Sequence, residues 1–353
     1  MSARLNALAA ESSAVSVKPL VATPRPRDAE AALPYLVRLT QANSYRDPMI
    51  MLRTAGIKTS QFQTGTVPID TIAGLLACDV DHIAHLDHIR GPDALRSKTR
   101  WLAGHEFPSS QIRLTSAHVC PECVRDDGYV SVFWGLRHAV ACPKHQYSPV
   151  ERCKACGREL RWRRPGLLKC GCGAPVARSP RSKRASEPVR TALALIHEWL
   201  LGSCPGGPDL IAAGYPLQAL GTVRPAGLVA LADRLADLPT IAGRATRRSR
   251  EERGLDALHR VLEDWPAGFH RFLAGAIGKK SFPGYFPLGK QKGSLYSRLF
   301  RGPEPDTFPF LEAEFMRFGL EVCDWGRPVI FSGGHCCHCR CETRRGAASD
   351  RER

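Results

Sequence analysis

The sequence predicts a mainly α protein whose helical regions are separated by a cysteine-rich segment. Apolar residues recur at helical spacing from residue 33 onward and again after residue 188. Between these regions, cysteines and one histidine stand in closely spaced pairs, a pattern typical of zinc-binding motifs. We therefore expect an N-terminal helix-turn-helix domain, two consecutive zinc-ribbon or knuckle motifs, and a C-terminal helical domain.

Composition narrows the function classes. With 353 residues the chain is long enough for two or three domains with cores of their own, and 43% hydrophobic residues exclude wholesale disorder. No apolar run approaches the roughly 18–20 residues that cross a bilayer, and we find no secretory signal. A formal net charge of +16 favours a nucleic-acid partner, with a solvated surface in an arginine-rich proteome as the alternative, and we expect no membrane partner. Paired cysteines without a signal indicate metal ligation in a reduced, cytoplasmic compartment.

The N-terminal region divides into a leader and a first domain. Residues 1–30 are rich in small residues and proline, and we expect a flexible leader. The first domain is predicted over 31–112. Its apolar positions indicate short helices on either side of a turn at 43–48.

Within this domain, residues 68–89 fit a helix-turn-helix, because small and apolar residues occupy the positions that pack two short helices across a tight turn. Ala77 takes the turn position where glycine is commonest, and Asp79 could cap a second helix over 80–88. Acidic residues beside that helix are repelled by phosphate. We therefore expect either that the helix docks on protein, or that the basic stretch after it makes the DNA contacts. An ordinary helical hairpin is the alternative. The candidate nucleic-acid or partner contacts are Asp81, His85, His88, Arg96, Lys98 and Arg100.

The middle region, 113–178, contains two sets of four metal ligands. Each Cys-x-x-Cys turn offers two thiolates to one ion, and a second pair completes a tetrahedron with no vacant position for water. Buried, reduced cysteines are the alternative, and His118 and His138 are spare ligands because each lies near a cysteine pair. We expect two structural Zn²⁺ ions. The first set is Cys120, Cys123, Cys142 and His145, and the second is Cys153, Cys156, Cys170 and Cys172.

Three segments follow the ligand sets. A basic linker rich in serine and proline is predicted over 179–187. Apolar stripes at helical spacing predict a helical domain over 188–330, and these stripes are core rather than a ligand site. The basic, cysteine-rich tail over 331–353 is expected to be disordered, because its cysteines stand too close together for one relaxed tetrahedral site. In the linker, the candidate phosphate contacts are Arg181, Lys183 and Arg184.

Known catalytic arrangements do not fit the chain. A zinc deaminase needs a His-x-Glu spacing and an open coordination position, and His105-Glu106 lacks that spacing. The segment 87–92 resembles the Asp-His-Ile-x-Pro strand of His-Asn-His nucleases, but it falls on a predicted helix and precedes the cysteine pairs. The sequence has no Walker loop, Gly-rich dinucleotide loop or Gly-x-Ser-x-Gly elbow. We therefore expect a protein that is not an enzyme.

Four motifs in order make the chain resemble TniQ, the target-selection protein of certain bacterial transposons. They are Leu33-Pro-Tyr-Leu-Val-Arg-Leu39, the two ligand sets, and Asp264-Trp-Pro-Ala-Gly-Phe269. The resemblance covers roughly residues 31–280. It implies a helix-turn-helix over about 68–89, the eight metal ligands named above, and a helical C-terminal domain. The leader and the cysteine-rich tail depart from the pattern expected of the family.

The resemblance also implies a role. Members of the family are non-catalytic recruiters that link a target site, read directly or through an RNA-guided DNA-binding complex, to an AAA+ ATPase that recruits a DDE transposase. A bacterial cytoplasmic location and a homodimer are compatible with this role. Two rivals use the same features: a zinc-containing helix-turn-helix transcription regulator, and a nuclease of the His-Asn-His type around His88.

Overall fold

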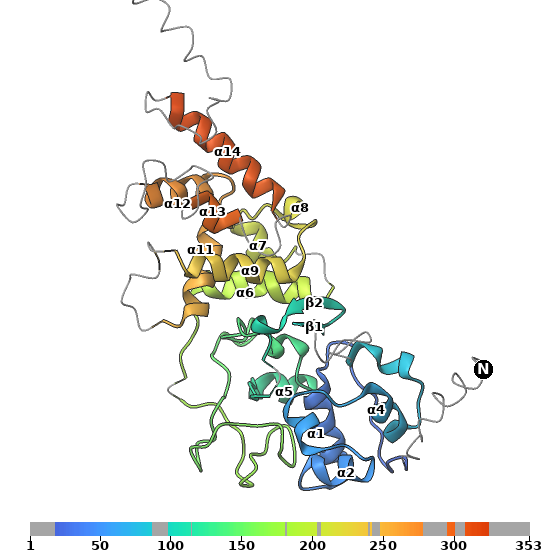
Figure 1. Ribbon diagram of the computed structural model, residues 1–353. Helices are drawn as coiled ribbons and strands as arrows, with labels where there is room; N and C mark the ends of the chain where they lie inside the picture. The colour runs from blue at the N-terminus through green and yellow to red at the C-terminus, as the bar shows by residue number, and fades with distance from the viewer. Residues whose placement is uncertain are drawn as a thin grey trace, which may run out of the picture. The chain divides into compact units, whose positions relative to one another are not determined.

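The computed structural model divides the chain into two compact units, Met1–Pro205 and Gly206–Arg353, which are described separately (Figure 1). Helices are the main regular structure of both units in the described residues, which confirms the mainly α class. No helix within the described residues is both long enough and apolar enough to cross a membrane. The structure describes residues 18–86, 98–113, 115–180, 182–202, 206–238, 241, 248–277, 295–300 and 308–324.

The first unit begins with three short helices, α1 (Ala32–Ala42), α2 (Pro48–Thr54) and α3 (Thr59–Gln63). Helix α1 buries an apolar face that α2 packs against, and the two are separated at the turn that the apolar pattern predicted. The Asp47 side chain caps α2 by accepting a hydrogen bond from the Met49 N–H at 2.9 Å.

Residues 18–30, the second half of the predicted leader, pack on these helices. The Leu20 N–H donates to the Leu75 carbonyl at 2.9 Å, and the Tyr35 hydroxyl donates to the Pro24 carbonyl at 2.9 Å. Glu30 is fully buried and pairs with Arg38 at 2.6 Å. A proline-rich composition predicts weak local structure, but it carries no information on hydrogen bonds to distant helices. Residues 1–17 of the predicted leader lie outside the described residues.

The predicted helix-turn-helix segment contains α4 (Ile69–Leu76) and a 3₁₀ helix, η1 (Val80–Leu86), which contact each other. Ala77 adopts the left-handed conformation at φ 52° and ψ 45°, so the turn position identified from the sequence is a sharp turn. The second element differs from the α-helix expected over 80–88, because the described part is a tighter and shorter 3₁₀ helix. The helix-turn-helix therefore stays a prediction.

A hairpin that the sequence analysis did not predict connects this segment to the cysteine-rich region. Strands β1 (Thr99–Leu102) and β2 (His105–Pro108) pair antiparallel, and Ala103 and Gly104 form the turn at φ 47° and 80°. Positive φ at both positions matches a tight two-residue hairpin turn. A short 3₁₀ helix, η2 (Ser109–Gln111), follows. Four-residue strands are too short for a clear alternating pattern.

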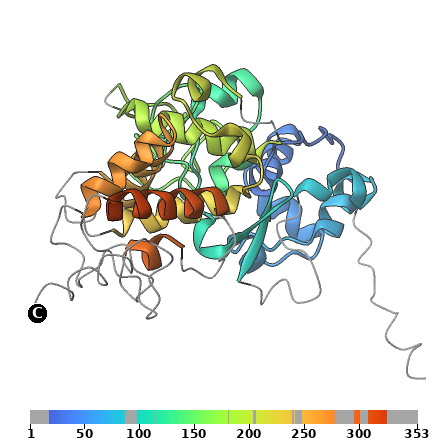
Figure 2. The same ribbon diagram turned by 90° about the horizontal axis from the view of Figure 1, so that it is seen from above.

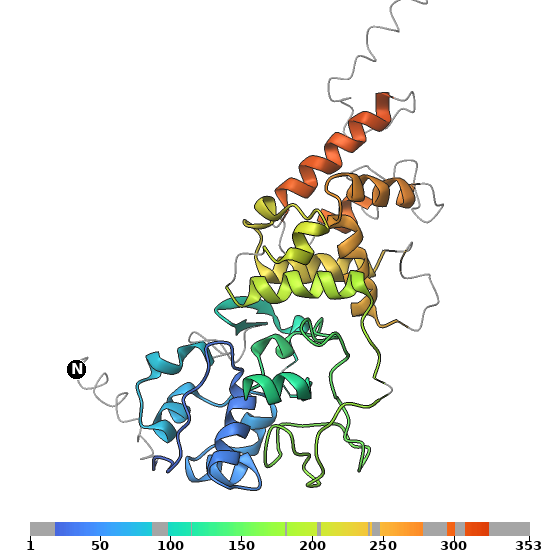
Figure 3. The same ribbon diagram turned by 180° about the vertical axis from the view of Figure 1, so that it is seen from behind.

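The cysteine-rich region is mostly irregular chain, as Figure 3 shows for the loops between α5 (Pro121–Asp127) and α6 (Glu187–Leu200). A 3₁₀ helix in this region, η3 (Val132–Gly135), carries a small core in which Phe133 and Trp134 are buried in edge-to-face contact at 5.5 Å. His197 of α6 contacts the Phe133 ring at 5.1 Å. Helix α6, which the sequence analysis grouped with the C-terminal helices, thus belongs to the first unit; the domain boundaries stay predictions.

The second unit is helical throughout its described residues. Helices α9 (Pro225–Ala236) and α11 (Arg250–Leu262) pack closely because Gly254 lets the Ala232 carbonyl approach: a Cβ at residue 254 would lie 2.4 Å from that oxygen. Helix α14 (Pro309–Asp324) lies beside α12 (Ala267–Ile277) (Figure 2), and the side chains of His270 and Glu314 on these two helices meet at 2.7 Å. The predicted tail over 331–353 lies outside the described residues. The helices are α7 (Pro208–Ala212), α8 (Leu217–Leu220), α9 (Pro225–Ala236), α11 (Arg250–Leu262), α12 (Ala267–Ile277), α13 (Leu295–Phe300) and α14 (Pro309–Asp324).

Candidate metal centres

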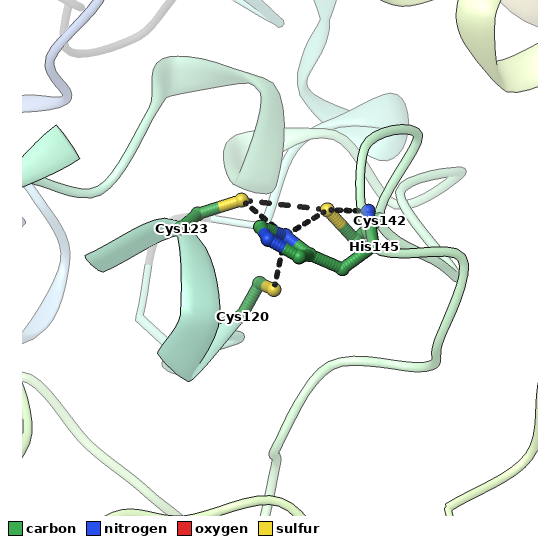
Figure 4. Close-up of side chains that lie close together, drawn as sticks. All are labelled: Cys120, Cys123, Cys142 and His145. Carbon is green, nitrogen blue, oxygen red and sulfur yellow. Dashed lines mark hydrogen bonds between the residues drawn. The ribbon is translucent and has the colours of Figure 1, made fainter. Parts of the chain in front are cut away.

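The first ligand set converges at the start of α5. Cys120 precedes the helix, Pro121 fixes its first residue, and Cys123 lies in its first turn, so both thiols face the same point. A tight loop brings up Cys142 and His145, where the His145 N–H donates to the Cys142 sulfur at 3.3 Å. Figure 4 shows the four side chains pointing toward one another. Their ligand atoms all lie within 4.8 Å of each other.

The distances within this set match the edges of a metal tetrahedron. His145 Nδ1 lies 3.4 Å from the Cys120 sulfur, 3.3 Å from Cys123 and 3.5 Å from Cys142, and the Cys123 and Cys142 sulfurs are 3.4 Å apart. Zinc bonds of about 2.3 Å to sulfur and about 2.0–2.1 Å to nitrogen give tetrahedral edges of roughly 3.5–3.8 Å. The set could therefore close around one ion.

The surroundings of this set favour metal binding. His145 Nε2, the nitrogen that faces away from the sulfurs, lies 3.2 Å from a carboxylate oxygen of Asp126. Such a carboxylate holds the ring in the orientation that a ligand needs. Hydrogen bonds from Cys120 and Cys123, and then from backbone N–H groups, lower the pKa of Cys142, while hydrogen bonds with Cys120 and Cys142 raise the pKa of Cys123. A thiolate is the form of cysteine that binds metal.

The second ligand set is built from two tight turns. The Gly157 N–H closes the first turn on the Cys153 carbonyl, and the Gly173 N–H closes the second on the Cys170 carbonyl, each at 2.9 Å. The sulfurs of Cys153 and Cys172 are 3.8 Å apart, and those of Cys156 and Cys170 are 3.9 Å apart. A tetrahedron of four sulfurs at about 2.3 Å from zinc has edges of about 3.8 Å. This set has that geometry.

Arginines surround the second set. The Arg158 side chain, with its backbone N–H, lowers the pKa of Cys156 to about 6. Arg164 is 1% exposed and lies against the Trp162 ring at 4.9 Å. Burial lowers the pKa of Arg164 to about 10, and the charge of Cys170 opposes that change. Burial raises the pKa of Cys170 itself to about 12.

The two spare histidines stand outside both sets. His118 is buried with its Nδ1 3.1 Å from a carboxylate oxygen of Glu151, and His138 is buried elsewhere in the region. Neither is a member of the ligand groups formed by the described residues. Asp126, Arg158 and Arg164 were missed by the sequence analysis. Of these three residues, only Asp126 could have been found from the sequence, because it follows Cys123 by three residues on one helix.

The predicted nucleic-acid contacts fall in separate places. Asp81 is exposed and His85 half-buried on η1, while Lys98 and Arg100 lie at the start of the hairpin. The predicted linker packs on the loop of the first set: Arg184 donates to the Gln146 side chain at 2.9 Å, and the Ser148 N–H donates to the Lys183 carbonyl at 3.0 Å. Outside the described residues lie His88, Arg96 and Arg181.

One family of known proteins matches part of the residues described above. The TniQ family model matches residues 21–148, a range that contains α1–α4, the hairpin and the complete first ligand set. This match confirms the family resemblance over residues 21–148, while the second ligand set and the motif at 264–269 lie outside it. No curated protein matches the chain.

Proposed function

We propose that this chain, whose residues 21–148 match the TniQ family model, is a non-catalytic adaptor that selects the target site for transposon insertion. It would link target DNA, or an RNA-guided DNA-binding complex, to an AAA+ ATPase and through it to the transposase. The family match carries this proposal. The formal net charge of +16 supports it, because such a field attracts the phosphate backbone of a nucleic acid.

We further infer that each ligand set holds one structural Zn²⁺. The edges of both sets fit zinc, and four protein ligands leave no open position for water or substrate. Metal at such a site contributes folding energy rather than chemistry. The two centres would therefore hold the irregular chain over 113–178 in one conformation, which supports a scaffold role.

A transcription regulator is the second candidate, and one observation favours it. The left-handed turn at Ala77 between α4 and η1 is the connection that a helix-turn-helix uses. A regulator of this kind would bind a defined duplex without any other protein. The nuclease has no comparable support, since its central residue His88 lies outside the described residues.

Reconstituted transposition separates the candidates. The chain is purified and combined with the transposase and ATPase encoded in the same element, and insertion sites are mapped with and without it. We expect insertion at the selected site to require the chain, and we expect its tight DNA binding to require the ATPase or guide complex. Tight, specific binding to bare duplex together with unchanged insertion in its absence would support the regulator.

A further inference from the structure

Arg164 is an anomaly in the first unit. It is the largest fully buried side chain, 1% exposed, and its Nε, Nη1 and Nη2 atoms have no hydrogen-bond partner within the described part of the chain. Arginine is almost never fully buried unless it is paired. An uncompensated charge in a protein interior costs several kcal/mol. The surroundings of Arg164 must therefore supply a negative charge in the functional protein.

The carboxylates near this segment are engaged elsewhere. Asp47 pairs with Arg163, and Glu159 pairs with Arg152 at 3.4 Å. The Trp162 ring at 4.9 Å offers Arg164 a cation–π contact, which stabilises a cation only in part. Among the described residues around Arg164, the counter-charge is therefore not a carboxylate.

The second ligand set is the neighbouring source of negative charge. The backbone of Arg163 lies against Gly171, since a Cβ at residue 171 would be 3.4 Å from the Arg163 carbonyl oxygen. This contact places the segment that carries Arg164 beside Cys170. Four thiolates around one Zn²⁺ leave a net charge of −2, whereas three thiolates and a histidine leave −1. The second centre therefore needs a compensating cation more than the first.

We propose that Arg164 is the buried counter-charge of the four-cysteine centre, a positioning residue that tightens metal binding there by neutralising part of the centre's charge. The proposal rests on the second zinc ion of the proposed function. It explains why a fully buried guanidinium is kept beside a set of sulfurs, and it predicts that Arg164 and the metal stabilise each other.

The other arginines of this segment do not share the role. Arg161 and Arg163 are exposed and line a cleft of about 880 Å³ beside the second set. Water and salt screen charges in such a position, so their effect on the metal is weak. Arg161 is therefore a matched control: it is the same residue type, three positions away, and exposed.

The test compares zinc affinity in the full chain for wild type, Arg164→Met, Arg164→Lys and Arg161→Met, by competition with a chromophoric chelator. We expect Arg164→Met to weaken one of the two sites by about 10- to 100-fold, the range found for outer-shell partners of metal ligands. Arg164→Lys keeps the charge and should recover part of the loss, and Arg161→Met should match wild type. The spectrum of bound Co²⁺ identifies the weakened site, since four-sulfur and three-sulfur sites differ.

Urea unfolding measured with and without zinc separates the proposed charge effect from a loss of packing. Without metal, Arg164→Met should be at least as stable as wild type, because it removes an unpaired buried charge; with zinc the order should reverse. Should Arg164→Met fold poorly, added zinc should restore its fold by mass action if only affinity is lost. Folding that excess zinc does not restore would overturn the proposal.

Two further outcomes are distinguishable. Equal zinc affinities for wild type and Arg164→Met, or for the Met and Lys variants, would refute the role of Arg164 and leave two zinc centres in place. A wild-type chain that binds zinc only at the first site would refute the second centre itself, and this proposal with it.

Discussion

Replacing Cys123 by serine removes one of the four atoms that enclose the first centre. Apparent binding free energies of structural zinc are about 10–16 kcal/mol, so one ligand of four accounts for about 2.5–4 kcal/mol. At 1.4 kcal/mol per tenfold, the loss is on the order of 10²- to 10³-fold in zinc affinity. The Cys123 sulfur lies 3.3–3.4 Å from two other ligand atoms. A serine hydroxyl in its place would therefore leave the set of four ligands incomplete.

The assay counts zinc per chain after dialysis against a chelator that leaves wild type loaded, and measures urea unfolding on the same samples. Wild type should retain two ions, and Cys123→Ser should retain one and unfold at lower urea. Cys78→Ser is the matched control, because Cys78 is a half-buried cysteine outside both ligand sets. Two ions retained by Cys123→Ser at wild-type affinity would refute the first centre, and loss of an ion from Cys78→Ser would refute the ligand assignment.

Three further tests, one of them with a control variant, concern the surroundings of the first centre, the packing of the second unit and a buried histidine of the first unit. Asp126→Asn should weaken zinc at the first site by about tenfold, measured by chelator competition, because the carboxylate that orients His145 is lost. Gly254→Ala should lower the free energy of unfolding by about 1–3 kcal/mol in urea, since its Cβ would lie 2.4 Å from a carbonyl oxygen. Gly275→Ala, which meets nothing within 4 Å, should be neutral or stabilising. Burial lowers the pKa of His197. Below about pH 6.5 the histidine therefore binds a proton in the unfolded chain but stays neutral in the folded chain, and the free energy of unfolding decreases as the pH is lowered. His197→Leu should flatten that fall in urea melts between pH 5 and 7; an unchanged slope would contradict this reading.

Much of the candidate site could be predicted from the sequence because metal ligation is local. Two residues in a Cys-x-x-Cys turn reach one ion whatever the rest of the fold does, so the pairs by themselves identified both sets, which the structure then brought together. The turn at Ala77 could also be predicted from local pattern, since Ala77 stands at the helix-turn-helix position where glycine, the residue that adopts the left-handed conformation most easily, is commonest.

Features that depend on distant contacts could not be predicted. The order of residues 18–30 comes from hydrogen bonds to α1 and α4, which composition does not encode. The burial of Arg164 depends on how the chain folds over it, and a run of arginines in the sequence suggests exposure instead. The hairpin over 99–108 is too short to show an alternating pattern. In the first two cases the deciding contacts join residues that lie well apart in the sequence, whereas the hairpin is local and was missed only because it is short.

The first centre also connects the metal to the predicted basic contacts. Tyr147 follows His145 by two residues; its ring is covered by the Arg178 guanidinium at 3.8 Å, and its backbone forms an antiparallel bridge with Arg184. The Ala185 N–H donates to the Gln146 carbonyl at 2.8 Å. The basic segment is therefore held on the loop that supplies the histidine ligand. Under the proposed function, a zinc ion that fixed this loop would also fix the positions of Lys183 and Arg184, two of the predicted phosphate contacts.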